Sequence, residues 1–121
     1  MISSIAPQLR TIDLDSTIRF YTDKLGFEFV FRYEDLYAAI RIGSHVIHLK
    51  YACEPDPSIA YVNEEGHLHL YFETQGIADL AEKLKENGVV LVNDVHETPW
   101  QTREIVVNDD QGHTLYFGEP A

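Results

Sequence analysis

The feature that most constrains the fold of this chain is an internal repeat. The pattern strand, helix, strand, strand, strand runs twice along the sequence, at an offset of roughly 62 to 68 residues. Gly26 and Gly88 end the two predicted helices, and His48 and Tyr116 hold matching places in the last strands. A unit with one helix covers only one face of its sheet. The sequence therefore predicts an α+β fold in which two βαβββ modules form a cupped mixed sheet around a cavity, with the helices outside.

The first module is expected at about residues 4–51. A strand over 5–12 precedes a helix over 16–24, for which the run Asp13-Leu-Asp-Ser offers N-caps. Alternating apolar residues then predict three further strands at about 27–31, 36–42 and 46–51. The next segment, 52–66, contains two prolines and several acidic residues and is interpreted as a connector.

The second module is expected at about residues 67–119. It should contain a strand over 67–73, a helix over 76–87, a strand over 89–92 and a closing hairpin. Asp109 to Gly112 supply the turn of this hairpin, in which Gly112 is free to take a positive φ. At 121 residues the two modules together make one domain.

Strand alternation separates two sets of side chains. One set is apolar and is expected to face the helices: Leu9, Ile40, Ile47, Leu49, Leu68, Leu70, Phe72, Ile105, Leu115 and Phe117. The opposite set is polar and aromatic: Ala6, Gln8, Arg10, Tyr37, Arg41, His48, Lys50, His67, His69, Tyr71, Glu104, Thr114 and Tyr116. Such a set fits a lined, wet cavity better than a solvated outer surface. His45 and His113 stand at turns and are expected to be exposed.

Composition narrows the classes of partner. The net charge of −11 disfavours nucleic acid and anionic membranes, and it suits either a cationic small molecule or simple solubility. No apolar run is long enough for a membrane span, and no cleavable signal is visible, so a cytoplasmic location is expected. Cys53 is the single cysteine, so no internal disulfide forms.

Several stretches resemble a known superfamily. The run Asp13-Leu-Asp-Ser-Thr-Ile-Arg-Phe-Tyr-Thr-Asp-Lys-Leu-Gly-Phe-Glu and the run Asn108-Asp-Asp-Gln-Gly-His are similar to segments of the vicinal oxygen chelate superfamily. This superfamily holds glyoxalase I, extradiol dioxygenases, and fosfomycin and bleomycin resistance proteins. Thr98-Pro-Trp-Gln-Thr-Arg-Glu, with Leu115-Tyr-Phe-Gly-Glu, most resembles the bleomycin resistance group. That resemblance implies a homodimer that sequesters a flat, cationic glycopeptide antibiotic at the dimer interface, without catalysis.

The resemblance also places the metal positions of the superfamily's enzymes. They fall on Ala6, His48, His69 and Tyr116. Ala6 has no ligand atom, and a tyrosine ligates only as a phenolate. A catalytic metal usually has about three protein ligands. We therefore expect no metal or other cofactor; the alternative is a divalent-metal enzyme that uses His48 and His69, with help from Gln8, His67 or Glu104.

A metal-free binding cavity needs aromatic plates and acidic groups for a cationic ligand. The predicted ligand-binding residues are Trp100, Tyr37, Tyr33, His48, His69, Glu104, Tyr116, Gln8 and Arg10. Trp100 has the alternative role of plugging its own core. Arg10 and Arg41 either pair with Glu104 or Glu73, or indicate an anionic ligand.

Three functions remain open from the sequence. The preferred interpretation is a small-molecule binding protein of the bleomycin resistance type. The alternative is a metal-dependent lyase, isomerase or ring-cleaving dioxygenase of the glyoxalase type. The third is a regulatory or accessory binding module with no link to antibiotics.

Overall fold

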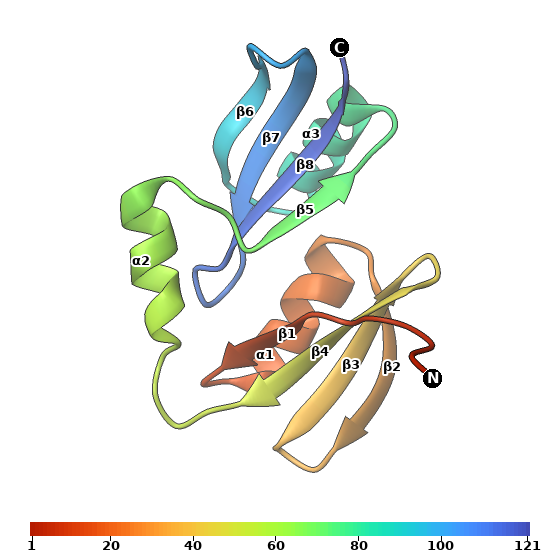
Figure 1. Cartoon of the computed structure of the whole chain (residues 1–121), viewed down its shortest axis with the longest axis vertical. Helices are drawn as coiled ribbons and strands as arrows, with labels where there is room; N and C mark the ends of the chain where they lie inside the picture. Colours follow the sequence, from red (N-terminus) through yellow and green to blue (C-terminus); the bar gives the residue numbers. More distant parts are fainter. The chain divides into compact units, whose positions relative to one another are not determined.

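A computed structural model describes residues 1–121, and the chain divides after Asp56 into two compact units. Module 1 is Met1–Asp56 and module 2 is Pro57–Ala121, and each is described by itself. Each module carries its own four-stranded mixed sheet (Figure 1). The predicted α+β class with two βαβββ modules is confirmed.

Module 1 has the strand order β1-β4-β3-β2, with β1 parallel to β4 and the other pairs antiparallel. The helix begins where Asp13 accepts a hydrogen bond from the backbone N–H of Ser16, and Gly26 follows it at a φ of 80°. Both features agree with the prediction. The elements are β1 (Gln8–Thr11), α1 (Leu14–Arg19), the π-helical turn η1 (Phe20–Lys24), β2 (Glu28–Tyr33), β3 (Tyr37–Ile42) and β4 (His45–Tyr51).

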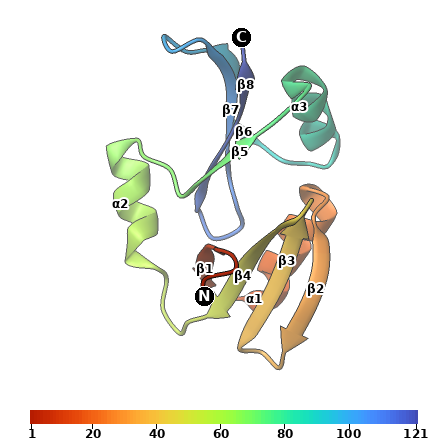
Figure 2. The ribbon, with the colours of Figure 1, turned by 45° about the vertical axis from the view of Figure 1, so that its right-hand side comes forward.

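Module 2 repeats this plan with the strand order β5-β8-β7-β6, in which β5 is parallel to β8. Figure 2 shows α3 covering one face of this sheet, while α2 precedes β5. The elements are α2 (Pro57–Glu65), β5 (Leu70–Glu73), α3 (Ile77–Glu86), β6 (Leu91–Glu97), β7 (Thr102–Asn108) and β8 (Thr114–Pro120).

The strand registers fix which residues correspond in the two modules. His48 pairs with Gln8 and Ala39, just as Tyr116 pairs with Tyr71 and Val106. Two positions further along β4 and β8, Lys50 pairs with Tyr37 and Gly118 pairs with Glu104. The correspondence predicted between His48 and Tyr116 is therefore confirmed. It also equates Gln8 with Tyr71, Tyr37 with Glu104, and Lys50 with Gly118.

The apolar strand faces form the cores of the two modules. Ile40, Leu49, Ile105 and Leu115 are fully enclosed, as the alternation predicts. Leu68 was expected among them, but it is 38% exposed. The reason is that β5 begins only at Leu70, so Leu68 precedes the sheet.

Helix α2 occupies most of the segment that was interpreted as a connector. None of its residues is buried, so the sequence carries no amphipathic stripe that would reveal it. Polar contacts hold it to the rest of module 2. The side-chain amide of Asn63 donates to the carbonyl of Gly112 at 3.1 Å, and the hydroxyl of Thr114 donates back to Asn63 at 3.0 Å.

The turn between β7 and β8 is built on Asp109. One of its carboxylate oxygens accepts hydrogen bonds from the backbone N–H groups of Gln111, Gly112 and His113. The other lies 2.8 Å from Nδ1 of His113. His113 is completely buried, so the expectation that it would be exposed at a turn is wrong. Gly112 takes a φ of 101°, as predicted. No helix of the chain is long and apolar enough to cross a membrane.

Candidate functional site

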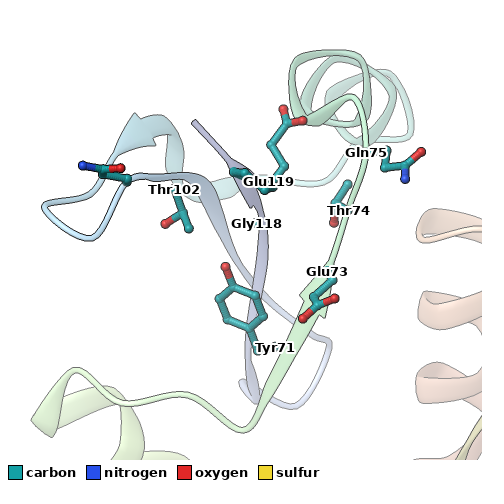
Figure 3. A pocket seen from close by; sticks show the side chains of 9 residues that line it. Tyr71, Glu73, Thr74, Gln75, Thr102, Gly118 and Glu119 are labelled. Carbon is teal, nitrogen blue, oxygen red and sulfur yellow. The ribbon is translucent and has the colours of Figure 1, made fainter.

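Module 2 contains a pocket of about 540 Å³ on the side of its sheet that α3 does not cover. This volume lies within the range typical of small-molecule sites. Figure 3 shows that the lining side chains come from β5, the start of β7 and the end of β8. The lining residues are Tyr71, Glu73, Thr74, Gln75, Gln101, Thr102, Gly118, Glu119 and Pro120.

Beneath the pocket, Glu104 gathers three hydrogen-bond donors on one oxygen. Its Oε2 accepts from the hydroxyl of Tyr71 at 2.8 Å and from the hydroxyl of Thr102 at 2.9 Å. The indole Nε1 of Trp100 lies 3.5 Å from the same oxygen. Glu104 is only 2% exposed, and no Lys, Arg or His of module 2 forms an ion pair with it. A buried carboxylate held only by neutral donors keeps its negative field directed into the site.

Gly118 makes this arrangement sterically possible. It stands on β8, between β5 and β7, so the Tyr71 side chain must pass over it to reach Glu104. A Cβ atom at Gly118 would lie 2.0 Å from the Tyr71 hydroxyl oxygen and 3.2 Å from Cγ of Glu104. Figure 3 shows the phenol turned across this strand toward Thr102. A glycine within a strand here marks a close side-chain approach.

The loop before β7 presents Trp100. The hydroxyls of Thr98 and Thr102 lie 2.7 Å apart at the base of this loop, and the backbone N–H of Thr98 donates to the carbonyl of Thr102. The Trp100 side chain is 67% exposed. It therefore does not plug its own core, and its aromatic face is available to a ligand.

The pocket wall is acidic. Glu73 makes no hydrogen bond or ion pair, and its carboxylate is free to meet a ligand. Glu119 is committed elsewhere, because it accepts from the backbone N–H groups of Gly76 and Ile77 and so caps the start of α3. No lysine or arginine lines the pocket. Module 2 as a whole has three basic and twelve acidic residues, against six and eight in module 1.

The pKa of the Tyr71 phenol is raised above its ordinary value. Burial is the largest cause, and the hydrogen bond and negative charge of Glu104 act in the same direction. Tyr71 therefore remains a neutral phenol whose hydroxyl donates a hydrogen bond to Glu104 throughout the physiological pH range.

Four of the predicted ligand-binding residues lie on the corresponding face of module 1. The amide of Gln8 donates to the Tyr37 hydroxyl at 2.9 Å, and that hydroxyl lies 2.9 Å from Nδ1 of His48. Arg10 is exposed and forms no ion pair. The structure thus joins Gln8, Tyr37 and His48 in one chain of hydrogen bonds.

Two other residues of module 1 that the sequence analysis named, Tyr33 and Arg41, take no part in this chain of hydrogen bonds. Tyr33 is exposed at the end of β2, close to the turn that leads to Tyr37. Arg41 pairs with Glu28 of its own sheet at 2.7 Å.

The side chains at the family's metal positions do not fit a divalent ion. Ala6 offers no donor, and Nδ1 of His48 already lies against the Tyr37 hydroxyl. Nδ1 of His69 accepts the backbone N–H of Thr114 at 3.0 Å, so its proton is on Nε2, which donates to Ser58 at 3.1 Å. No three His, Cys, Asp or Glu side chains gather in a group that could hold a metal. Tyr116 lies with its ring 6.5 Å from that of Tyr71 and is half-buried.

Sequence reasoning placed Glu104 and Trp100 in the site, and the structure brings these two together. It named Glu73 only as a possible partner of Arg10 or Arg41, and it did not single out Gln101, Thr102 or Gly118. The alternation did place Tyr71 on the correct face, and a glycine within the last strand was an available signal of close packing. Which side chains meet above that glycine depends on the register of three strands, which the sequence pattern does not carry.

The sequence profile of the Glyoxalase/Bleomycin resistance protein/Dioxygenase superfamily matches residues 2–117. The chain belongs to this superfamily. No match was found among curated protein sequences.

Solved structures share the fold at low sequence identity. A glyoxalase-related enzyme from Clostridium phytofermentans has a TM-score of 0.80 and 23% identity, over 100% of this chain and 97% of its own. TioX from Micromonospora sp. ML1 has a TM-score of 0.77 and 18% identity, over 98% and 99%. The bleomycin-binding protein of Streptomyces verticillus, solved with copper(II)-bleomycin, has a TM-score of 0.71 and 22% identity, over 97% of each chain. Binding proteins and enzymes therefore share this architecture.

Proposed function

We propose that the protein is a non-catalytic binding protein for a small organic cation with a flat aromatic part, and that the pocket of module 2 is its site. The observation that carries this proposal is the buried Glu104 carboxylate, which has neutral donors and no basic partner within module 2. Its charge is left for a ligand to balance.

The neighbouring groups suit the same ligand class. Glu73 offers a free carboxylate at the wall, and no lysine or arginine lines the pocket, although Arg103 pairs with the wall residue Glu119 at 3.7 Å. Trp100 presents an exposed indole whose N–H faces Glu104, so the ring is oriented before a ligand arrives. A cation over an indole gains about 0.5–2 kcal/mol, depending on how far it is desolvated.

The more specific form of this proposal is sequestration of a cationic glycopeptide antibiotic. The shared fold with a bleomycin-binding protein supports it. We propose further that binding needs no metal, and that the chain works as a cytoplasmic homodimer. Analytical ultracentrifugation of the purified protein checks the dimer, and a single monomeric species at micromolar concentration would contradict it.

The test of the ligand class uses the fluorescence of Trp100, the only tryptophan. Metal-free bleomycin and thioflavin T, a flat aromatic cation, are titrated in parallel with 1-anilinonaphthalene-8-sulfonate, a flat aromatic anion. We expect saturable quenching by the cations, weakened about tenfold in Glu73→Gln. Saturable binding of the anion alone would refute the proposal. Binding of thioflavin T without bleomycin would keep the ligand class and remove the antibiotic.

The metal-dependent alternative has its own test. Purified protein is reconstituted separately with Zn, Ni, Mn and Fe, desalted and analysed for bound metal. We expect well below one ion per chain. One retained ion per chain, lost in His48→Ala or His69→Ala, would instead favour the enzyme.

A further inference from the structure

Left-handed backbone conformations in this chain are almost always assigned to glycine. Eight residues have a positive φ, and six of them are glycines. The exceptions are Glu34, at 49°, and Gln101, at 64°. Glu34 stands three residues before Tyr37, and Gln101 stands three residues before the corresponding Glu104. A side chain with a Cβ atom is strained in this region of φ.

The turn geometry requires this conformation at Gln101. Its N–H donates to the carbonyl of Thr98 at 3.1 Å, and its own carbonyl accepts from Ala121 at 2.9 Å. Hairpin loops that end in a left-handed residue usually place glycine or asparagine there, because these residues bear the conformation at lower cost. Glutamine at this position therefore stabilises the protein less than the two usual residues would.

The location of the Gln101 side chain gives a reason for a glutamine at this strained position. The side chain lines the pocket, next in sequence to the exposed Trp100. Its amide makes no hydrogen bond within the chain, so both its donor and its acceptor are free. Strained residues that persist against an easier alternative gather at functional sites.

We propose that Gln101 is a specificity-determining residue of the pocket. Its side-chain amide binds a neutral hydrogen-bonding group of the ligand, such as an amide, a hydroxyl or a ring nitrogen, that lies beside the cationic part. This inference rests on the proposed binding site in module 2. It extends that proposal from a cationic ligand to one that also carries a neutral polar group.

The first part of the test measures stability without any ligand. Gln101→Gly and Gln101→Asn keep the turn and relieve the strain, so each should raise the melting temperature by about 1–4 °C. Glu34→Gly is the matched control, because it relieves the same kind of strain in module 1, away from the pocket. Melting temperatures of both Gln101 variants at or below the wild-type value would overturn the inference.

The second part measures binding by protein NMR. Thioflavin T and a fragment set of aromatic ammonium compounds, neutral aromatic amides and aromatic carboxylates are titrated while the amide signals of Thr102 and Gly118 are followed. We expect Gln101→Gly and Gln101→Asn to weaken amide-bearing fragments about five- to tenfold, and Glu34→Gly to leave them unchanged.

The outcomes separate this inference from the proposed function. Neutral or anionic fragments that bind and are weakened by the Gln101 variants, while thioflavin T and the ammonium compounds do not bind, would support the role of Gln101 and refute the cationic ligand class. Amide-bearing fragments that bind equally well to all variants would overturn the inference, and binding of thioflavin T and the ammonium compounds would still keep the ligand class. No fragment shift at Thr102 or Gly118 would overturn the role of Gln101.

Discussion

Glu104 of module 2 and Tyr37 of module 1 hold the same place in their sheets, and each accepts a hydrogen bond from the first strand. In module 1 the donor is the amide of Gln8, and the chain of bonds ends at His48. In module 2 the donor is the phenol of Tyr71, which crosses Gly118 where module 1 has Lys50. One backbone plan thus carries a network of amide, phenol and imidazole groups in one copy and a buried carboxylate in the other.

This difference shows how a duplicated scaffold acquires a binding site in one copy. The backbone pairing is the same, so the positions at which side chains meet across three strands are the same. A glycine on the middle strand then gives the Tyr71 ring the space that the Lys50 side chain occupies in module 1. The site in module 2 follows from a few substitutions at positions that both copies possess.

The largest loss of unfolding free energy is expected at one of two corresponding turns, the β7–β8 turn of module 2, and not at the β3–β4 turn of module 1. Asp109→Ala removes the acceptor of three backbone N–H groups and the partner of the buried His113, and should cost about 3–5 kcal/mol of unfolding free energy. Ser44→Ala, in the simple turn of module 1, should cost less than about 0.5 kcal/mol. Urea unfolding measures both. Equal losses would show that the two turns contribute alike.

The next largest loss of unfolding free energy is expected at the two corresponding hydrogen-bond acceptors, Glu104 and Tyr37. Glu104→Ala leaves the hydroxyls of Tyr71 and Thr102 without their shared partner, and should cost about 2–3 kcal/mol. Tyr37→Phe removes one hydroxyl from the module 1 network and should cost about 0.5–1 kcal/mol. Urea unfolding of the two variants measures both losses of unfolding free energy. A Glu104→Ala protein as stable as wild type would mean that the buried charge costs as much as its hydrogen bonds contribute.

A smaller loss of stability is expected when the space above Gly118, on the middle strand β8, is filled. Gly118→Ala forces the Tyr71 phenol away from Glu104 and should cost about 1–2 kcal/mol, with a changed Trp100 emission spectrum. Lys50→Ala, its counterpart, should stay within about 0.5 kcal/mol of wild type. A Gly118→Ala variant with wild-type stability and emission would contradict the assigned role of this glycine.

The smallest effect is a pH dependence. The raised pKa of Tyr71 means that the folded protein holds this proton more tightly than the unfolded chain does. Stability from this source is complete below the unfolded tyrosine pKa of about 10 and is lost as the pH rises through the folded value. Wild-type unfolding free energy should therefore fall more steeply above pH 10 than that of Tyr71→Phe. Parallel curves for the two proteins would contradict the shift.

Much of the fold could be predicted because its signals are local. Alternation identified most strands and their buried faces, although β6 runs over Leu91–Glu97 and not over the predicted 89–92. Gly26 and Gly112 were placed correctly, and the N-cap lies within the predicted run Asp13-Leu-Asp-Ser. Leu68 was misplaced because the start of β5 depends on its pairing with β8. Helix α2 was missed because no apolar stripe accompanies it, and the burial of His113 follows from the turn that Asp109 organises.

The candidate site was predictable only in part. The face of Glu104 followed from alternation, whereas the sequence left open whether Trp100 contacts a ligand or plugs its own core. The convergence of Tyr71, Thr102 and Trp100 on one oxygen required the register of β5, β8 and β7 together with side-chain conformations. The strained backbone of Gln101 leaves no mark in composition or periodicity, because the left-handed conformation follows from the turn geometry and not from the type of residue at this position.

Helix α2 also sets where the second copy of the repeat can be cut from the chain. The repeat suggests an expression fragment that begins near residue 67. Such a fragment would lack Asn63, which binds Gly112 and Thr114, and Ile59, whose side chain would lie 3.0 Å from a Cβ placed on Gly112. The boundary that retains these contacts lies ten residues earlier, at Pro57, so the genetic unit of the duplication and the physical unit of folding do not start at the same residue.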